Sequence, residues 1–177
     1  MIKANIIGLD ALQRRISNAP QEIQSEVAAE IQVAAWEYRD GAKRDLAAQG
    51  GDRGTLLRSI DTKQVGPLTY EVSAGVFYAP YIEFGTKSKF NPYPGTEEFA
   101  AQYKGSARSS SLTLIEAIKG WVKRKGIATG KEIDRVAFLI ARSIYRNGIK
   151  PKPFFYKQIT PVRENLIKRL NIIFNGI

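Results

Sequence analysis

The chain has 177 residues, of which 44% are hydrophobic, and it contains no Cys and no His. Its 27 Lys and Arg outnumber its 17 Asp and Glu, which gives a formal net charge of +10. This length predicts a single domain with a packed core. The absence of thiols and imidazoles excludes disulfide frameworks, Cys or His zinc sites and triad-type nucleophilic catalysis.

The positive charge is distributed unevenly along the chain. Residues 1–88 carry 10 Lys and Arg against 11 Asp and Glu, whereas residues 89–177 carry 17 against 6. All the excess positive charge therefore lies in the second part of the sequence. This pattern predicts either a solvated basic face or a face that meets an acidic partner or nucleic acid, and both interpretations stay open.

The strongest periodic signal predicts a long amphipathic helix near the N-terminus. Asp10 is expected to cap a short helix over residues 12–16, and Pro20 then starts a new helix in its first turn. From Ile23 to Leu46, apolar residues recur at spacings of three or four, with charged residues at the other positions. Gly50–Gly51 is expected to end this helix.

Residues 55–86 predict a small antiparallel meander packed on the long helix. Residues 70–74 alternate apolar and polar side chains at the period of a half-buried strand, and Gly66–Pro67 supplies a turn before them. We expect the aromatic segment Val76–Phe84 to form a further strand. The exposed edges of so small a sheet invite pairing with another subunit.

Residues 87–147 are expected to form an insertion within one domain that spans residues 1–177. Residues 87–111 contain the Pro, Gly and Ser of a long loop, which we interpret as a mobile arm. Two helices are predicted after it, starting near Thr113 and Thr129, because each Thr precedes a Glu by three residues as in a capping box.

The end of the chain is predicted to be extended and then helical. The prolines in Gly148–Pro153 exclude a continuous helix, whereas Thr160–Pro161 supplies a cap and a first-turn Pro for a terminal helix. The predicted fold class is α+β. No apolar stretch is long enough to cross a bilayer and no signal peptide is evident, so we expect a soluble protein made in a cytoplasm.

The sequence offers little for catalysis. Gly50–Gly54 lacks the Lys–Ser/Thr of a phosphate-binding loop, and the pairs Asp52 with Asp61 and Glu97 with Glu98 are more typical of solvated carboxylates than of metal ligands. We therefore expect no catalytic residue, no metal site and no cofactor. A metal-dependent nuclease is the least implausible enzyme, and nothing in the sequence favours it.

A basic run, Trp121–Gly126, could contact phosphates through its cations and stack on a base through its indole. Because Trp121 follows Ile118 by three residues, we instead expect its ring in the core and the cations at a helix C-terminus. The residues of the predicted basic face are Lys119, Lys123, Arg124, Lys125, Arg135, Arg142, Arg146, Lys150 and Lys152.

The most unusual local sequence is Tyr78–Thr86, in which aromatic residues surround the single carboxylate of Glu83. Such a segment is typical of core packing on one face of a strand and of an interface on the other. An acid among apolar residues is costly unless it is paired, so we expect Glu83 to meet a Lys or Arg of this chain or of a neighbouring copy.

Three segments in order resemble a known family. Gly54–Ile60, then Tyr78–Thr86, then Pro151–Phe155 before a terminal helix resemble the gene-product-ten-like tail components of long-tailed bacteriophages. That family is described as minor tail, tail-completion or head–tail joining protein. Many of its members pass quickly from the second segment to the third, whereas residues 87–147 intervene here.

The resemblance implies a structural, non-enzymatic protein of the phage neck or tail, located in the virion and made in the bacterial host cytoplasm. It implies a ring, expected to be sixfold, between the head connector or head-closure protein and the tail terminator or tail tube protein. Residues expected at its interfaces are Tyr78, Tyr81, Glu83, Phe84, Gly85, Thr86, Pro153, Phe154 and Phe155.

The basic residues of the second part would then face an acidic ring or the passage for genomic DNA. Because tight phosphate binding would hinder DNA transit, we favour an acidic protein partner for most of this charge. The alternative from another class is a basic nucleic-acid-binding module.

Overall fold

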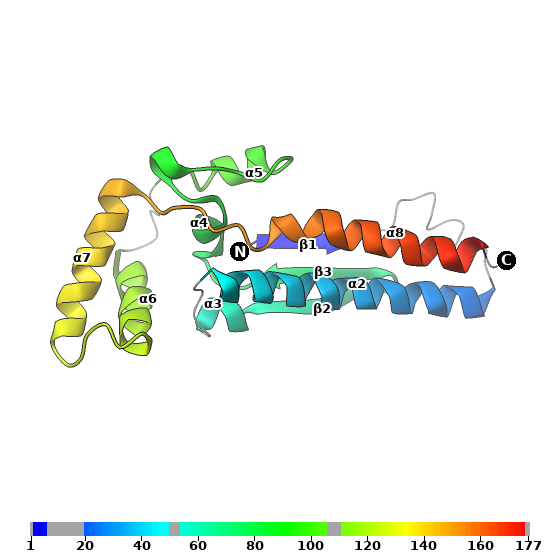
Figure 1. Ribbon diagram of the computed structural model, residues 1–177, viewed down its shortest axis with the longest axis horizontal. Helices are drawn as coiled ribbons and strands as arrows, with labels where there is room; N and C mark the ends of the chain where they lie inside the picture. Colours follow the sequence, from blue (N-terminus) through cyan, green and yellow to red (C-terminus); the bar gives the residue numbers. More distant parts are fainter. Residues whose placement is uncertain (1, 7–19, 50–53, 106–110, 176–177) are drawn as a thin grey trace. The chain divides into compact units, whose positions relative to one another are not determined.

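A computed structural model describes residues 2–6, 20–49, 54–105 and 111–175 of the chain (Figure 1). Its contacts divide the chain into two compact units. Unit 1 consists of Met1–Val76 and Phe154–Ile177, and unit 2 consists of Phe77–Pro153. The single-domain organisation, with residues 87–147 as an insertion, stays a prediction.

Unit 1 contains a three-stranded antiparallel sheet in the order β1-β3-β2. Its strands are β1 (Ile2–Ile6), β2 (Ile60–Gly66) and β3 (Thr69–Ala74), and β2 and β3 form the hairpin that the Gly66–Pro67 turn predicted. In the central strand, Ala74 lies opposite Ile2 on one side and Ile60 on the other. All three are fully buried, which identifies the face of the sheet that meets the core.

The strand expected over Val76–Phe84 is wrong. Ala79–Phe84 is instead a short helix, α4, with Pro80 in its first turn. The physical reason is that proline has no amide hydrogen for a ladder, whereas its fixed φ suits the start of a helix. The third strand comes from the N-terminus, which the sequence had not indicated.

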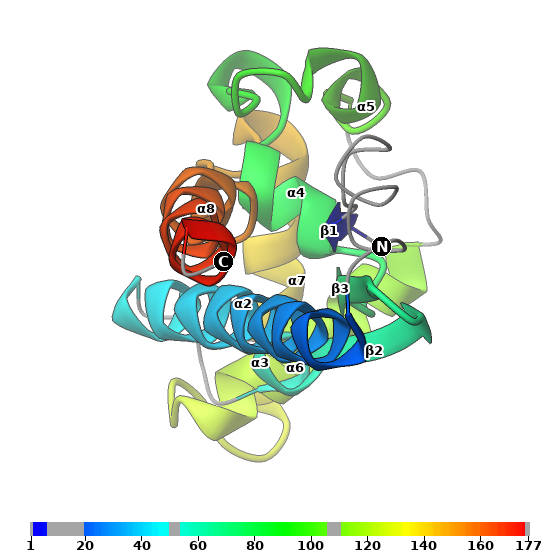
Figure 2. The same ribbon diagram turned by 90° about the vertical axis from the view of Figure 1, so that its right-hand side faces the viewer.

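The long helix of unit 1 packs on the sheet and on the C-terminal helix. The long helix α2 (Gln21–Ala48) contacts β2, β3 and the C-terminal helix α8 (Ile159–Asn175), as Figures 1 and 2 show. The short helices α3 (Thr55–Arg58) and η2 (Tyr156–Gln158) lie before β2 and α8 respectively. The long N-terminal helix packed on an antiparallel sheet and the terminal helix are thus confirmed, as is the α+β class.

The buried side of α2 carries Val27, Ile31, Ala34, Ala35, Tyr38, Ala42 and Leu46. Tyr38 packs edge-on against Phe155, with 5.2 Å between the ring centroids. Between α2 and α8, the Arg169 guanidinium donates to Glu37 at 2.9 and 3.2 Å and forms an ion pair with Glu30. Burial lowers the pKa of Arg169, but Glu37 and Glu30 raise it by more, so the guanidinium is firmly charged.

Unit 2 contains α4, η1 (Lys87–Lys89), α5 (Glu97–Ala101), α6 (Ser111–Arg124) and α7 (Glu132–Asn147). The two expected helices are therefore confirmed, and they pack as a hairpin around buried Ile118, Val122, Ala128 and Ala137. The expected loop over residues 87–111 is less irregular than predicted, because η1 and α5 lie within it.

Some predictions fall outside the described residues. These are the short helix capped by Asp10, the Gly50–Gly51 helix stop and part of the predicted arm, residues 106–110. Among the helices that the structure describes, none is long and apolar enough to span a membrane.

Candidate docking site

The Gly85–Thr86 segment that follows α4 is hydrogen-bonded to the extended segment that follows α7. The Thr86 amide donates to the Ile149 carbonyl at 3.0 Å, and the Ile149 amide donates back to the Thr86 hydroxyl at 2.8 Å. Further along, the Lys152 amide donates to the Ile82 carbonyl at 2.8 Å. Two segments that are more than sixty residues apart in sequence are therefore joined by hydrogen bonds within unit 2, and we call this contact the junction.

Two glycines make this junction possible. Gly85 has φ 70° and ψ −174°, and Gly148 has φ 74° and ψ 173°, a region that only glycine adopts at ordinary cost. A Cβ on Gly85 would lie 2.7 Å from the Ile149 carbonyl oxygen, and one on Gly148 would overlap the Thr86 carbonyl. The junction thus depends on the Gly-Thr pair that ends the family-like segment.

Aromatic rings hold the loop after the junction against α4. Phe84 packs against Phe99 and Tyr103, with ring centroids 6.2 and 6.5 Å away, and Tyr81 meets Tyr103 edge-on at 5.4 Å. Burial, and secondarily the neighbouring Tyr103, raises the pKa of the Tyr81 phenol. The sequence did not predict this cluster, although the four-residue spacing of Phe99, on α5, and Tyr103, in the turn after α5, was a usable signal.

The predicted interface residues differ in how much surface they offer. Within unit 2, Glu83, Phe84, Gly85 and Thr86 are buried, Tyr78 and Tyr81 are half-buried, and Pro153 is exposed. In unit 1, Phe154 and Phe155 are fully buried in the core beside Tyr38. The role of the predicted interface residues stays a prediction. In this structure the buried ones among them contribute to internal packing and offer no surface to a partner.

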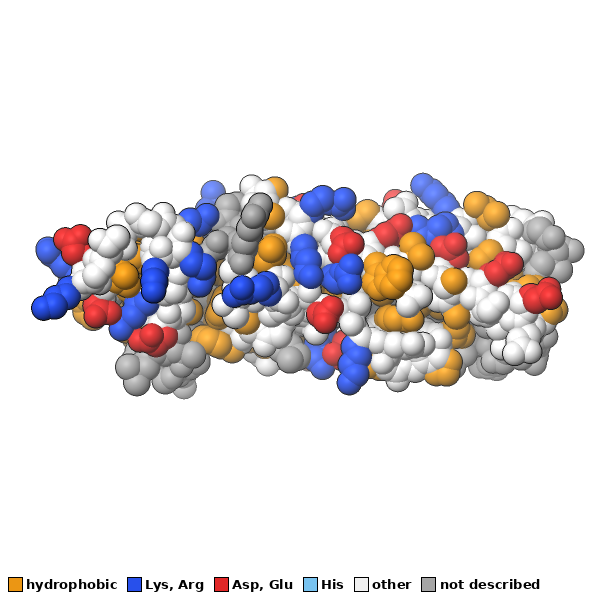
Figure 3. Space-filling model, turned by 90° about the horizontal axis from the view of Figure 1, so that it is seen from below, with side chains coloured by type: hydrophobic (Ala, Val, Ile, Leu, Met, Phe, Trp, Pro, Cys, Tyr) orange, Lys and Arg blue, Asp and Glu red, His pale blue; other side chains and the backbone are white. Residues whose placement is uncertain are grey.

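The predicted basic face lies on α6, on α7 and on the extended segment after α7. Lys123, Arg124, Lys125, Arg135, Arg142, Arg146, Lys150 and Lys152 are all exposed. Figure 3 shows Lys and Arg side chains spread over the α6–α7 hairpin, with a few acidic ones among them. Lys119 differs, because its ammonium pairs with Glu116 at 3.0 Å and Asp134 at 2.9 Å.

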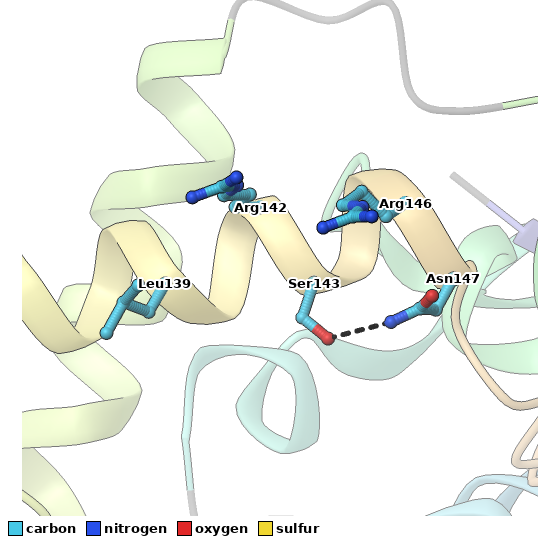
Figure 4. A pocket seen from close by; sticks show the side chains of 5 residues that line it. All are labelled: Leu139, Arg142, Ser143, Arg146 and Asn147. Atoms are coloured by element: carbon cyan, nitrogen blue, oxygen red, sulfur yellow. Dashed lines mark hydrogen bonds between the residues drawn. The ribbon is translucent and has the colours of Figure 1, made fainter.

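A shallow groove runs along α7, and its lining is basic at one side. Leu139, Arg142, Ser143, Arg146 and Asn147 line it, and the Asn147 amide donates to the Ser143 hydroxyl at 3.2 Å (Figure 4). Both guanidinium groups project from the same side of the helix, one turn apart (Figure 4). The groove offers charge and hydrogen-bond donors but no nucleophile activated by a base.

Trp121 lies at the rim of the hairpin and not in its core as predicted. Its side chain is 36% exposed, while Ile118 and Val122 occupy the buried positions of α6. The prediction failed because Val122, one residue further on, takes the core position. On α7, Phe138, Leu139 and Tyr145 are exposed by half or more, which the sequence reasoning had not identified.

The described residues contain no group of three or more acidic side chains that could hold a metal ion. Glu83 is 1% exposed, so it is not a solvent-accessible ligand, and Asp52 lies outside the described residues. Among the described residues, the site thus combines a hydrogen-bonded junction, an aromatic cluster and a basic helix.

Comparison with known families gives one match. Residues 10–85 match the family model described as bacteriophage HK97-gp10, putative tail-component. The family resemblance is confirmed over this segment. The HK97-gp10-like match runs through α2, the β2–β3 hairpin and α4 and ends at Gly85, the first residue of the junction. Comparisons with curated proteins and with solved structures give no match.

Proposed function

We propose that the chain is a structural subunit of the phage neck or tail that acts in tail completion and head–tail joining. The observation that carries the proposal is the HK97-gp10-like match over residues 10–85, which indicates a structural tail component of a virion. The subunit works by binding, as a ring whose copies and neighbours meet through protein surfaces. A sixfold ring between the head connector or closure protein and the tail terminator or tube is the arrangement we propose.

The structure supports different roles for the two units. The family match covers α2 and the β2–β3 hairpin of unit 1 and ends with α4 of unit 2, whereas the α6–α7 hairpin of unit 2 lies wholly outside the match. The hairpin has its own buried core and an exposed basic surface. We infer that unit 1 is the shared scaffold and that the hairpin supplies docking specific to this chain.

The basic surface suits an acidic protein better than DNA. Arg142 and Arg146 stand beside exposed Leu139, so the surface offers apolar area together with charge. Apolar area beside charge is typical of protein interfaces, whereas phosphate backbones are bound by charge and hydrogen bonds. Strong phosphate binding in a channel would also slow the passage of the genome.

The test is to delete the gene for this chain from its phage and to image the particles by electron microscopy. We expect separate heads and tails, or tails that are incomplete, and joined particles once the wild-type chain is supplied from a plasmid. Normal joined particles without the chain would refute the proposal. Mass spectrometry of purified wild-type virions should detect the chain in a fixed ratio to other tail proteins.

One observation favours a second candidate function, nucleic-acid binding. Trp121 is partly exposed near the cations Lys123, Arg124 and Lys125, as a nucleic-acid-binding module would require. Such a module would bind duplex or single-stranded DNA at low salt with an affinity that falls steeply as salt rises. Fluorescence anisotropy with labelled DNA distinguishes the two functions, and absence of binding at low salt rejects this one.

A further inference from the structure

The outer side of α7 presents basic and apolar side chains. We name Arg135, Phe138, Leu139, Arg142 and Arg146 the α7 face. Successive members are one to four residues apart, and together they lie opposite the buried side of the helix. Phe138 is 57% exposed and Leu139 is 51% exposed. Within the described ranges, the three arginines of this face form no ion pair, so their charge is not neutralised inside the chain.

The outer side of α2 presents the complementary chemistry. We name Glu22, Glu26, Val33, Trp36 and Asp40 the α2 stripe; all five are exposed and lie opposite the buried side of α2. Trp36 is 44% exposed and Val33 is 37% exposed, although both are large apolar residues on a surface. In Figure 3, acidic side chains follow one another along unit 1 with apolar ones between them.

We propose that the α7 face of one copy docks on the α2 stripe of a second copy. The α7 face places apolar Phe138 and Leu139 between Arg135 and Arg146, and the α2 stripe places apolar Val33 and Trp36 between acidic residues. The contact joins two different surfaces, so it runs head to tail and either closes a ring or extends a filament. The inference rests on the proposed function, because it specifies how ring subunits would meet.

The α7 face is shorter than the α2 stripe and fits within it. At a rise of about 1.5 Å per residue, Arg135 to Arg146 spans about 16 Å, whereas Glu22 to Asp40 spans about 27 Å. The apolar residues of the α7 face and of the α2 stripe supply the area that docking would bury. The opposite charges of the two surfaces would orient the two copies and speed their association. Asp40 is held partly by Arg39 at 2.7 Å, so Glu22 and Glu26 are the main acidic contacts that the stripe offers.

Charge also explains why α2, and not α8, is the docking partner. The outer side of α8 exposes Ile167 and Ile172, but it also exposes Arg163 and Lys168. These cations would repel the arginines of the α7 face. The outer side of α8 exposes a single acid, Glu164, whereas α2 exposes three, Glu22, Glu26 and Asp40, beside its exposed apolar residues.

The experiment exchanges the charges and measures mass by sedimentation velocity over a concentration series of the full chain. Variant A carries Glu22→Lys and Glu26→Lys, and variant B carries Arg142→Glu and Arg146→Glu. Each alone should self-associate at least about 100-fold more weakly than the wild type, because like charges then face each other. An equimolar mixture of A and B should recover association, since each then offers a complement to the other. Recovery also shows that both variants are folded.

The matched control replaces Arg163 and Lys168 by Glu, which changes the net charge as variant B does but on α8. This control should associate as the wild type does. The inference is overturned if the wild type stays monomeric at about 100 μM in low salt, a limit that detects contacts with a Kd up to that range. It is also overturned if A and B associate normally, or if their mixture does not recover. If the chain assembles and the substitutions in A and B do not weaken that assembly, this contact is refuted. The proposed ring-forming function would not be refuted by that result, because the imaging of phage particles tests it separately.

Discussion

Replacement of Gly148 by Ala is expected to break the junction that joins the two ends of unit 2. The residue has φ 74° and ψ 173°, where an alanine costs about 1–3 kcal/mol in backbone strain. Its Cβ would also overlap the Thr86 carbonyl, and such overpacking costs about 1–3 kcal/mol more. Together the two effects lower the free energy of unfolding by about 4 kcal/mol.

Gly126 is the matched control for this substitution. It also has a positive φ of 63°, but nothing lies within 4 Å of where its Cβ would be. Gly126→Ala should therefore cost only about 1–2 kcal/mol, from the left-handed backbone alone. The comparison separates the close approach at the junction from the general cost of a side chain at positive φ.

Two measurements read out the effect. Urea denaturation gives the free energy of unfolding of each variant, and hydrogen exchange follows the Ile149 amide, which donates to the Thr86 hydroxyl. In Gly148→Ala, exchange at this amide should accelerate by about three orders of magnitude, since each 1.4 kcal/mol corresponds to tenfold. Equal destabilisation by Gly148→Ala and Gly126→Ala would refute the reasoning, because the junction would then contribute nothing specific.

Three further substitutions test other contacts. Thr86→Val leaves the Ile149 amide without its acceptor and should cost about 1–3 kcal/mol in urea denaturation, whereas Thr86→Ser should recover most of that loss. Arg169→Met removes the paired hydrogen bonds to Glu37 and should cost about 1 kcal/mol, measured against Arg163→Met as an exposed control. Tyr81→Phe should reduce the loss of stability above pH 10, followed by urea denaturation at pH values from 8 to about 11.

The sign of the pH effect follows from the direction of the Tyr81 shift. Its folded pKa is raised above the ordinary value of 10.0, so the folded state favours the neutral phenol. The contribution to stability is complete below the unfolded pKa and is lost as the pH rises through the folded pKa. The explanation fails if Tyr81→Phe and the wild type lose stability equally above pH 10. Similarly, unchanged stability in Thr86→Val would show that the hydroxyl does not satisfy the Ile149 amide.

The long helices could be predicted from the sequence, because their apolar residues repeat at helical spacing over many residues. The spacing of apolar residues from Ile23 to Leu46 predicted α2, and its buried side consists largely of those residues. The same holds for α6, α7 and α8, where a repeating apolar pattern exceeds any competing local preference. The Gly66–Pro67 turn likewise predicted the β2–β3 hairpin.

The short elements could not be predicted, because their form depends on tertiary partners. The aromatic run before Gly85 suits a strand or a helix, and Pro80 together with packing on Phe99 and Tyr103 favours the helix. Strand β1 is only five residues long and gains its pairing from β3, which lies more than sixty residues away. No local pattern carries that information.

For the candidate site, the sequence identified the right segments but not the exposure of their side chains. It singled out Tyr78–Thr86 and Pro151–Phe155, and the structure shows that Thr86 anchors one side of the junction while Phe154 and Phe155 fill a core. The exposed aromatic residues Trp36, Phe138 and Tyr145 were not among those selected. Burial depends on what each helix packs against, which a single sequence does not show.

Complementation in vitro tests head–tail joining most directly. Heads and tails are purified from a lysate of phage that lacks the gene for this chain, and infectious particles are counted after the purified chain is added. We predict that the wild-type chain restores infectivity, that Gly148→Ala restores much less, and that Gly126→Ala restores nearly as much as the wild type. If the wild-type chain restores no infectivity to heads and tails that are each complete, the chain does not join them and the account is wrong.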